Sequence, residues 1–309
     1  MSTQSNPLKA IDSIEKQTTI SMRLRDLAML FKVRLTIIVV LSALLGYFMG
    51  TSVIDLGKLL ALTFGGFLLT GASNGLNQVW ERDLDKLMNR TMNRPLPTGR
   101  MSTAEGLIIS LVSGFAGVFI LWYFLNTIAG VLGLLAIFSY VLLYTPLKQK
   151  SAIAVFVGAF PGAIPPMLGY VAATSDFDVA PGLLFATQFM WQFPHFWAIA
   201  WVADEDYRRA GYKLLPFASG QTKSSAFQIF LYSMMLIPVS LLPWVFPLEA
   251  PMIGNWAFAG VLLAGLGFAY TAWKLYISCD MKDAKKVMFA SFIYLPIVQI
   301  LYVLDKLTL

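Results

Sequence analysis

The stretch NQVWERDLDKLMNRTMNRPLPTGR, residues 77–100, places three carboxylates and five Lys or Arg residues at the end of an uncharged run that begins at Leu59. An apolar run of about 20 residues is what a helix needs to cross a bilayer, because every backbone polar group must then be satisfied within the segment. The charges appear where that run stops. This stretch is therefore predicted to be the water-facing end of a membrane helix.

The composition extends this interpretation to the whole chain. Hydrophobic residues make up 57% of the 309 residues and charged residues only 13%, whereas soluble domains carry about a quarter charged residues. We predict a polytopic membrane protein surrounded by lipid, with no nucleic-acid partner. Residues 1–25 are polar and lack the apolar core of a signal peptide. They are predicted to be a cytosolic tail, and residues 26–309 a single polytopic domain.

Hydropathy predicts an all-α integral membrane fold with nine spanning helices. The predicted spans are residues 28–50, 59–80, 106–126, 128–145, 152–173, 181–202, 225–247, 254–277 and 287–304. The fifth span contains Pro161, Pro165 and Pro166, which are expected to kink or break it because proline lacks the N–H of a helical hydrogen bond.

The distribution of basic residues predicts the orientation. With the N-terminus inside, 21 of the 23 Lys and Arg residues fall in cytoplasmic segments, as the enrichment of these residues in cytoplasmic loops requires. Only Lys58 and Lys306 fall outside. The chain is therefore predicted to begin in the cytosol and to end outside, with residues 77–100 facing the cytosol.

Two acidic triplets end the second and the sixth predicted helix, both on the cytosolic side. The first is Glu81, Asp83 and Asp85, and the second is Asp204, Glu205 and Asp206. Each is followed by basic residues, a Leu-Pro pair and a Gly. This likeness suggests an internal duplication, in which two four-helix halves are followed by a ninth helix.

The spacing of the first triplet indicates a binding site. Asn77, Glu81 and Asp85 recur every four residues and form a stripe about 12 Å long on one helix face. Like charges at this spacing repel, so a positive partner is expected. One interpretation is a solvated helix end whose carboxylates pair with Arg82, Lys86 and Arg90. The second acidic cluster favours another, a site for a Mg²⁺-diphosphate, since Mg²⁺ is usually held by one or two carboxylates plus phosphates.

In that interpretation, basic side chains would bind the phosphate oxygens directly. The candidates are Arg90, Arg94, Arg100, Lys148, Arg208 and Lys213. The hydrocarbon part of the substrate would then lie among the helices.

The motif Asn77-x-x-x-Glu81-x-x-x-Asp85, followed by MNRTMNRPL at 88–96, resembles the first aspartate-rich motif of the UbiA-type intramembrane prenyltransferases, and its ending is similar to their heme O synthase branch. Three further segments resemble that branch in its order: YTPLKQK at 144–150, GAIPPMLGYVA at 162–172 and PHFWAIAWVADEDYRRAGYKLLP at 194–216. The chain departs from the wider family in having Glu81 for aspartate. It also has Ala210 where a second D-x-x-x-D motif would end.

The resemblance implies transfer of a farnesyl group from farnesyl diphosphate to a vinyl group of heme b, with addition of water, giving heme O. It implies Mg²⁺ as cofactor, with Asn77, Glu81, Asp85 and Asp206 as metal-binding and catalytic residues, and it leaves open whether Asp204 or Glu205 binds the metal instead of Asp206. The further substrate contacts that it implies are Asp83, Arg90, Asn93, Arg94, Arg100, Tyr144, Lys148, His195, Tyr207 and Arg208.

The same resemblance implies a place in the cell. It indicates the bacterial cytoplasmic (inner) membrane, with the active site facing the cytosol. It also implies heme A synthase or the assembly of a terminal oxidase as partners.

His195 is the only histidine and stands eleven residues before Asp206, so on a continuous helix the two would share nearly one face. A polar side chain at membrane depth tends to face the bundle interior or a cavity. Two interpretations stay open. The histidine is either satisfied by a neighbouring polar group, or it contacts the porphyrin as the resemblance implies, with ligation of the iron as one form of that contact.

Two other functions were weighed against heme farnesylation. A prenyltransferase of the same fold acting on an aromatic or quinone-precursor acceptor would be favoured by a complete second D-x-x-x-D, which this chain lacks. A transporter is expected to place ionisable groups near the middle of the membrane. Here His195 is almost alone in the predicted spans, and the carboxylates gather at one face.

Overall fold

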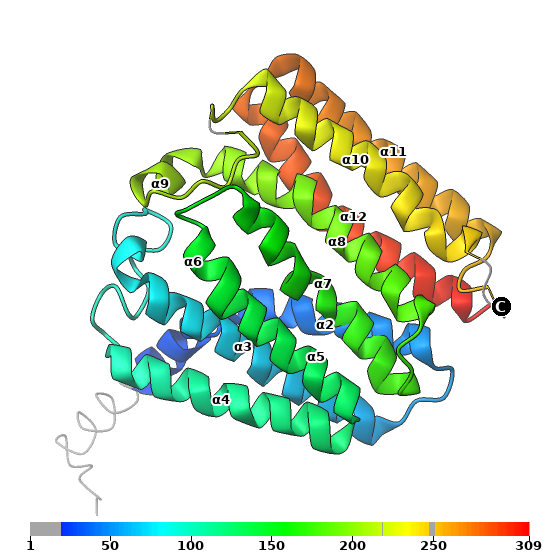
Figure 1. The fold of residues 1–309 in the computed structure, drawn as a ribbon, viewed down its shortest axis with the longest axis horizontal. Coiled ribbons are helices and arrows are strands. Elements are labelled where there is room, and N and C mark those ends of the chain that lie inside the picture. Colours follow the sequence, from blue (N-terminus) through cyan, green and yellow to red (C-terminus); the bar gives the residue numbers. More distant parts are fainter. Residues whose placement is uncertain (1–19, 218, 247–250, 309) are drawn as a thin grey trace, which may run out of the picture.

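The computed structural model describes residues 20–217, 219–246 and 251–308, and the described residues are helical with no β-strand. Most of the predicted cytosolic tail, residues 1–19 with Asp12 and Glu15, lies outside them. A helical segment at residues 20–30 comes first. It is followed by α2 (Val33–Gly50), α3 (Leu56–Asp85), α4 (Thr103–Phe124), α5 (Thr127–Phe138), the π-helix η1 (Ser139–Tyr144), α6 (Thr145–Leu147), α7 (Ile153–Thr174), α8 (Val179–Val202), α9 (Asp204–Arg209), α10 (Lys223–Val245), α11 (Asn255–Ser278) and α12 (Met281–Lys306) (Figure 1).

Eight helices in the described part of the chain are long and apolar enough to cross a membrane: α2, α3, α4, the continuous run α5–η1–α6, α7, α10, α11 and α12. The all-α membrane architecture is thereby confirmed. Helix α8 is 24 residues long, but polar residues such as Gln188, Gln192 and His195 lower its hydropathy. All three are buried, so these polar groups face protein. The predicted number of nine spans and the orientation of the termini remain predictions.

Most helix boundaries differ from the predicted ones by a few residues, and two of these differences bear on the site. The first span begins at Val33 and not at residue 28, because the backbone at Lys32 takes a left-handed conformation, with φ 47°, that ends the preceding helical segment. The second runs to Asp85, beyond the predicted residue 80. Hydropathy missed these last turns, since they are polar. The carboxylate stripe therefore lies on the helix itself.

Helix α7 runs without a break through its three prolines, so of the predicted kink or break the break is wrong and the kink stays a prediction. Pro166 has no N–H for the carbonyl of Gly162, and the Nε2 of Gln188 on α8 donates to that carbonyl at 2.6 Å. Gln192 Nε2 also donates to α7, at Ala159 O at 2.8 Å, although the residue four positions later is Ala163 and not a proline. The Gln188 side chain thus satisfies the carbonyl that Pro166 leaves open, as is required in lipid.

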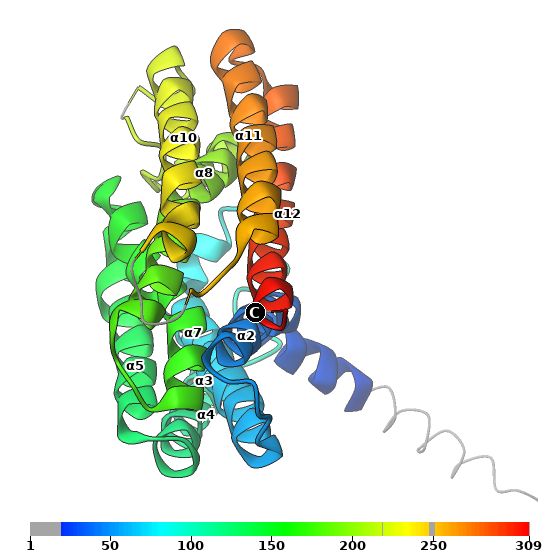
Figure 2. The same ribbon diagram turned by 90° about the vertical axis from the view of Figure 1, so that its right-hand side faces the viewer.

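The helices pack into one bundle with two large apolar clusters. One joins α8, α10, α11 and α12 and includes Val155 and Ala159 of α7 and Met49 of α2, and the other joins α2, α3, α4, α5 and α7. Helices α8, α10, α11 and α12 lie in the upper part of Figure 2 and the other helices in its lower part. Helices α2 and α7 cross at close range, which glycines at the crossing permit. A Cβ at Gly46 would collide with the backbone of α7, and one at Gly169 would collide with the backbone of α2. Helix α7 contributes to both clusters, so the clusters do not decide the predicted division into two four-helix halves and a ninth helix. The duplication itself stays a prediction.

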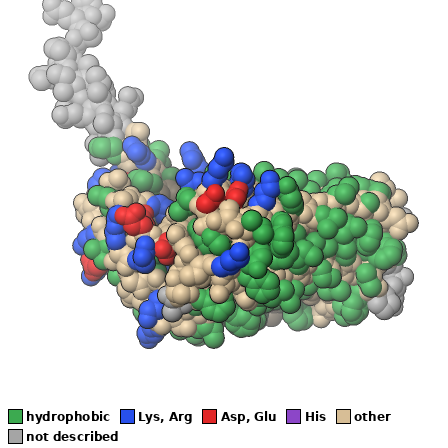
Figure 3. Space-filling view, turned by 90° about the horizontal axis from the view of Figure 1, so that it is seen from above, with side chains coloured by type: hydrophobic (Ala, Val, Ile, Leu, Met, Phe, Trp, Pro, Cys, Tyr) green, Lys and Arg blue, Asp and Glu red, His purple; other side chains and the backbone are tan. Residues whose placement is uncertain are grey.

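Charged side chains are not spread evenly over the surface. Figure 3 shows Lys, Arg, Asp and Glu gathered toward one end of the face in view, while hydrophobic side chains cover the other end. Exposed apolar residues such as Phe115, Leu263 and Ile293, on α4, α11 and α12, suit contact with lipid. The ends of α3, α6 and α8 meet the charged region, and this is where the candidate site lies.

Candidate active site

The stripe on α3 is buried. Asn77, Glu81 and Asp85 are 1%, 4% and 0% exposed, and the polar residues Asn74 and Gln78 continue the same region of the helix inward. Carboxylates are almost never fully buried unless they are paired. The stripe is therefore not a solvated helix end, and each of its acids needs a partner.

The expected positive partners are present. The Nζ of Lys148, at the end of α6, lies 2.8 Å from Glu81 Oε1, and the NH1 of Arg94, in the α3–α4 loop, lies 2.7 Å from Asp85 Oδ2. Burial favours the neutral form of Lys148, but the charge and hydrogen bond of Glu81 oppose that effect and the pKa of the amine is raised. Both ion pairs thus join residues that the sequence predicted for one site.

Aromatic rings surround the Lys148 amine. Its Nζ lies 4.6 Å from the centre of the Tyr144 ring and 5.7 Å from that of Tyr212, distances at which a cation is attracted to a ring face. Tyr144 was predicted for the site, whereas Tyr212 was not. Burial, followed by the Glu81 charge, raises the pKa of the Tyr212 hydroxyl.

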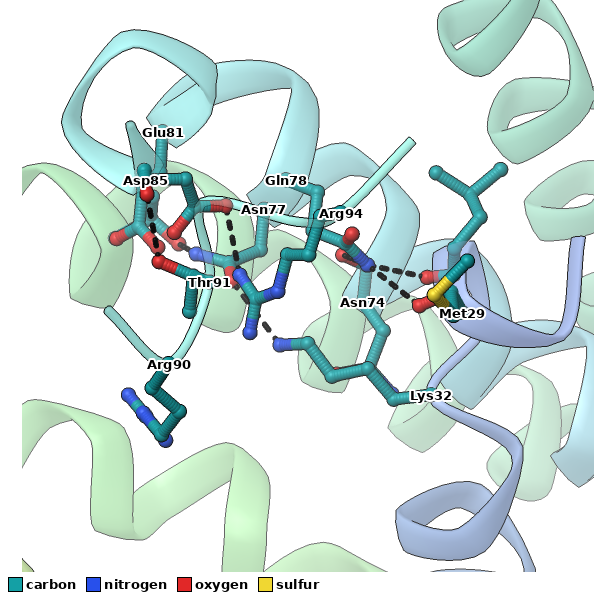
Figure 4. Close-up of polar contacts among 12 residues, drawn as sticks. Met29, Lys32, Asn74, Asn77, Gln78, Glu81, Asp85, Arg90, Thr91 and Arg94 are labelled. Atoms are coloured by element: carbon teal, nitrogen blue, oxygen red, sulfur yellow. Dashed lines mark hydrogen bonds and ion pairs between the residues drawn. The ribbon is translucent and has the colours of Figure 1, made fainter. Parts of the chain in front are cut away.

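A third cation enters from the start of α2. Lys32 Nζ donates to Asn77 Oδ1 at 3.4 Å, while Asn77 Nδ2 donates to Thr145 Oγ1 at 3.1 Å. Figure 4 shows the Lys32 side chain directed toward Arg94 and Asn77. Burial lowers the pKa of Lys32 well below its usual value, and the nearby charges of Arg94 and Lys148 lower it further. No sequence pattern pointed to Lys32, because it lies inside the predicted first span.

Helix α9 brings the second acidic triplet to the α3–α4 loop. The two carboxylate oxygens of Asp206 accept the backbone N–H groups of Asn89 and Arg90, each at 3.2 Å. The Arg90 guanidinium points away from the α3 carboxylates (Figure 4) and donates to the Tyr207 hydroxyl at 3.3 Å. Asp206, Arg90 and Tyr207 therefore join the two charged segments that were predicted to form the site.

Other predicted site residues have their polar groups engaged elsewhere. Asp83 is exposed and pairs with Arg82 and Lys86. Arg100 pairs with the buried Asp26 at 3.0 Å and donates to the carbonyl of Asn93 at 2.9 Å. Arg208 is exposed and pairs with Asp204 at 3.2 Å. Arg100 and Asn93 thus shape the loop that carries Arg94, and none of these contacts involves Glu81 or Asp85.

His195 does not lie on one continuous helix with Asp206, because the chain bends at Ala203 between α8 and α9. Its Nδ1 lies 2.8 Å from Ser291 Oγ on α12, and its ring stacks on Trp191 with centres 4.1 Å apart. Ser291 Oγ donates to Met288 O at 2.6 Å. With the serine proton donated to Met288 O, Nδ1 is the donor of the pair and Nε2 keeps its lone pair.

The acids suit a hard cation held jointly with a ligand. Among the described residues there is no group of three or more acidic, His or Cys side chains close enough to hold a metal alone. Asp85 Oδ1, however, is buried without a hydrogen-bond partner, and Glu81 lies one turn away on the same face. Two carboxylates are the usual protein share of a Mg²⁺ site completed by phosphates. The residues present therefore fit that ion.

An apolar cavity of about 140 Å³ begins one turn beyond Asn77. It is lined by residues of α2, α3, α4, α5, η1 and α7, and along α3 it extends from Asn74 to Leu62, about 18 Å at the rise of a helix. Tyr140 and Pro161 also line it. The charged cluster therefore lies at one end of a long apolar cavity.

Comparison with known proteins agrees with this geometry. Residues 39–293 match the model of the UbiA prenyltransferase family. The chain is 46% identical over 285 residues to the protoheme IX farnesyltransferase of Christiangramia forsetii, covering 92% of this chain and 94% of that one. It is 45% identical over 279 residues to the protoheme IX farnesyltransferase of Cytophaga hutchinsonii, covering 90% and 96%.

Two solved structures have the same fold at low sequence identity. A digeranylgeranylglyceryl phosphate synthase superposes with a TM-score of 0.77 at 19% identity, over 93% of this chain and all of that one. A UbiA homolog from Archaeoglobus fulgidus bound to GPP and Mg²⁺ superposes with a TM-score of 0.69 at 13% identity, over 92% and 100%.

Proposed function

The chain belongs to the UbiA prenyltransferase family, and we propose that it transfers the farnesyl group of farnesyl diphosphate to a vinyl group of heme b, giving heme O. The relatives that are named protoheme IX farnesyltransferases, at 45–46% identity over nine-tenths of the chain, support this acceptor. The observation that carries the proposal is the buried, ion-paired α3 stripe at the mouth of an apolar cavity. A diphosphate with a hydrocarbon tail matches both parts.

Glu81 and Asp85 would hold Mg²⁺ together with the diphosphate, with Asn77 and Asp206 beside them. The orphaned Asp85 Oδ1 supports this assignment. When bound, Mg²⁺ supplies Lewis-acid stabilisation of the charge on the leaving diphosphate. The assignment requires Lys148 and Arg94 to share the carboxylates with the ion or to turn toward the phosphate oxygens.

The basic side chains stabilise the leaving group. As the C1–O bond of farnesyl diphosphate breaks, its electron pair leaves with the diphosphate, and Arg94 and Lys148 are in place to bind the negative oxygens. The vinyl π electrons then form the new bond to C1, water adds to the resulting cation on the porphyrin side chain, and a proton is released. Arg90 and Arg208 would contribute after a change of rotamer.

His195 is the candidate contact for the heme. Its Nδ1 is committed to Ser291, so the free lone pair on Nε2 can accept a hydrogen bond or bind a metal. Trp191 and Phe292 flank the imidazole and fix its direction. Iron ligation by His195 is part of the proposal and stays a prediction.

The active site would face the cytosol of a bacterium from its inner membrane, with nine helices spanning the bilayer. The surplus of Lys and Arg at one end supports this orientation. If the product is heme O, a following step must use it. We therefore propose heme A synthase or the assembly of a terminal oxidase as a partner. The gathering of carboxylates at one face also argues against a transporter.

The test of the proposed function is incubation of the purified protein with heme b, farnesyl diphosphate and Mg²⁺, with and without EDTA. We expect a product with the mass of heme O that forms only without EDTA. A prenylated aromatic acid in place of a heme product would retain the diphosphate site and change the acceptor. The absence of any transfer, with folded protein in the assay, would refute the proposal.

The cavity predicts a change of chain-length preference. A Cβ at Gly66 would have only ordinary contact with Val40, so Gly66→Phe can be built and would fill the cavity about 12 Å along α3 from Asn74. We expect kcat/KM for farnesyl diphosphate to fall at least about tenfold, since overpacking costs about 1–3 kcal/mol, while geranyl diphosphate is affected less. Rates with both substrates are the measurement. Gly267→Phe, on α11 in open space, is the matched control, and equal loss with both substrates would contradict the prediction.

A further inference from the structure

The break before α2 is unusual in its backbone. Lys32 has φ 47° and ψ 54°, and it is one of three non-glycine residues with positive φ in the part of the chain that the structure describes. Such a conformation is strained for a side chain with a Cβ, and persists where the surroundings impose it. The question is what imposes it here and what the strain achieves.

Side chains of α3 hold the break. Gln78 Nε2 donates to the carbonyls of Met29 and Leu30, at 3.2 and 2.6 Å, and Asn74 Nδ2 donates to that of Phe31 at 3.4 Å. These carbonyls lie at the end of the helical segment 20–30, where the regular helical bonds run out. Met29 O also accepts the Lys32 N–H at 3.2 Å, and Phe31 O accepts the Thr36 hydroxyl at 2.7 Å. The same face of α3 that carries the carboxylate stripe therefore fixes the point at which the preceding segment stops.

Glycines on α3 permit this contact. A Cβ at Gly71 would press into the ring of Phe31, and one at Gly75 would lie 3.4 Å from the Leu30 side chain. The break thus lies directly against α3, and Lys32, the next residue, must send its side chain along the stripe.

The Lys32 amine ends beside a neutral partner. Its hydrogen bond is to the amide oxygen of Asn77 at 3.4 Å, and it forms no ion pair within the described residues, whereas Lys148 and Arg94 already neutralise Glu81 and Asp85. The Lys32 amine is therefore a basic group that is not needed to balance the acids, and its hydrogen bond to an amide leaves it available to a ligand in a partly buried site. Such a group suits a multiply charged anion.

We propose that Lys32 is a ligand of the substrate's diphosphate group, delivered to the site by the strained break that Asn74 and Gln78 hold. This inference rests on the proposed function and adds a residue from a helix that the acidic motifs do not include. In it, the amine leaves Asn77 Oδ1 and binds a phosphate oxygen. The Asn77 amide oxygen is thereby free for the cation that accompanies the diphosphate.

The test uses inorganic pyrophosphate with Mg²⁺ as the probe, titrated calorimetrically into the full chain in detergent, together with KM for farnesyl diphosphate. For Lys32→Met we expect the Kd for pyrophosphate and the KM for farnesyl diphosphate each to rise roughly 10- to 100-fold. This is the effect of losing one charge-assisted hydrogen bond. Lys32→Arg should restore much of the binding. Wild-type affinity in Lys32→Met, while the wild type binds pyrophosphate and makes heme O, would overturn this inference and leave the proposed function intact.

Lys32→Gly separates binding from folding. Glycine tolerates positive φ, so this variant should unfold at a temperature no lower than the wild type and yet bind pyrophosphate as weakly as Lys32→Met. Cys279→Gly, at a position with φ 53° at the end of α11, is the matched control and should change neither constant. A Lys32→Gly protein that loses stability but keeps its pyrophosphate affinity would show that Lys32 only supports the fold. A wild type that binds pyrophosphate and makes no heme O would overturn the acceptor while the Lys32 assignment stands.

Discussion

Replacing Glu81 with glutamine is expected to lower the rate of farnesyl transfer by roughly 10²- to 10³-fold, because a bound metal ion contributes several kcal/mol and each 1.4 kcal/mol is tenfold in rate. Glutamine keeps the size of the side chain and removes its charge. In the wild type the Lys148 amine lies 2.8 Å from Glu81 Oε1, and the substitution leaves this buried amine without a counter-charge. The measurement is heme O formed per minute at saturating substrates.

Loss of stability has to be separated from loss of catalysis. Removing one partner of a buried ion pair costs about 3–5 kcal/mol, whereas removing both is often neutral. Glu81→Gln with Lys148→Met should therefore regain the unfolding temperature and remain inactive. Glu105→Gln, which breaks the surface pair with Arg23, is the control for a lost carboxylate. If the single variant were folded and kept wild-type turnover, Glu81 would not be a metal ligand.

The α3 stripe could be predicted from sequence because it depends on local rules. Asn77, Glu81 and Asp85 follow the period of a helix, and like charges at that period demand positive partners. The apolar segments that became α2 to α12 follow from the length that a bilayer requires. The partners Lys148 and Arg94 were found only as members of a longer set of basic residues and by resemblance. Spacing does not say which of several cations reaches a given acid.

The features of the site that could not be predicted from the sequence depend on contacts between segments that are far apart along the chain. Lys32 enters the site because α3 side chains end the segment before it, and no pattern around residue 32 predicts that break. Tyr212 reaches Lys148 through the loop after α9, which has no regular period. The bend at Ala203 separates His195 from Asp206, although the chain around it is helical on both sides. The rule that residues spaced by whole helical turns share a face no longer holds beyond a residue whose backbone leaves the helical conformation, as Ala203 does.

Asp206→Asn is the second variant for which we expect a large loss, about 10²-fold in turnover. Asp206 has two possible tasks. It can bind the metal ion, and its two oxygens accept the N–H groups of Asn89 and Arg90, which fix the loop that carries Arg94. Asparagine offers one oxygen and an NH₂ group, so one of the two N–H groups would face another donor.

The dependence on Mg²⁺ distinguishes these tasks. If Asp206 is a metal ligand, the Mg²⁺ concentration that gives half-maximal rate should rise at least about tenfold in Asp206→Asn, as it does when metal affinity is lost. If Asp206 only anchors the loop, the maximal rate should fall at an unchanged Mg²⁺ requirement, because the ion would still meet Glu81 and Asp85. Asp176→Asn, an exposed aspartate beyond the far end of α7, should behave as wild type. We expect the first result, since a third carboxylate would complete the oxygen ligands that two carboxylates and a diphosphate begin.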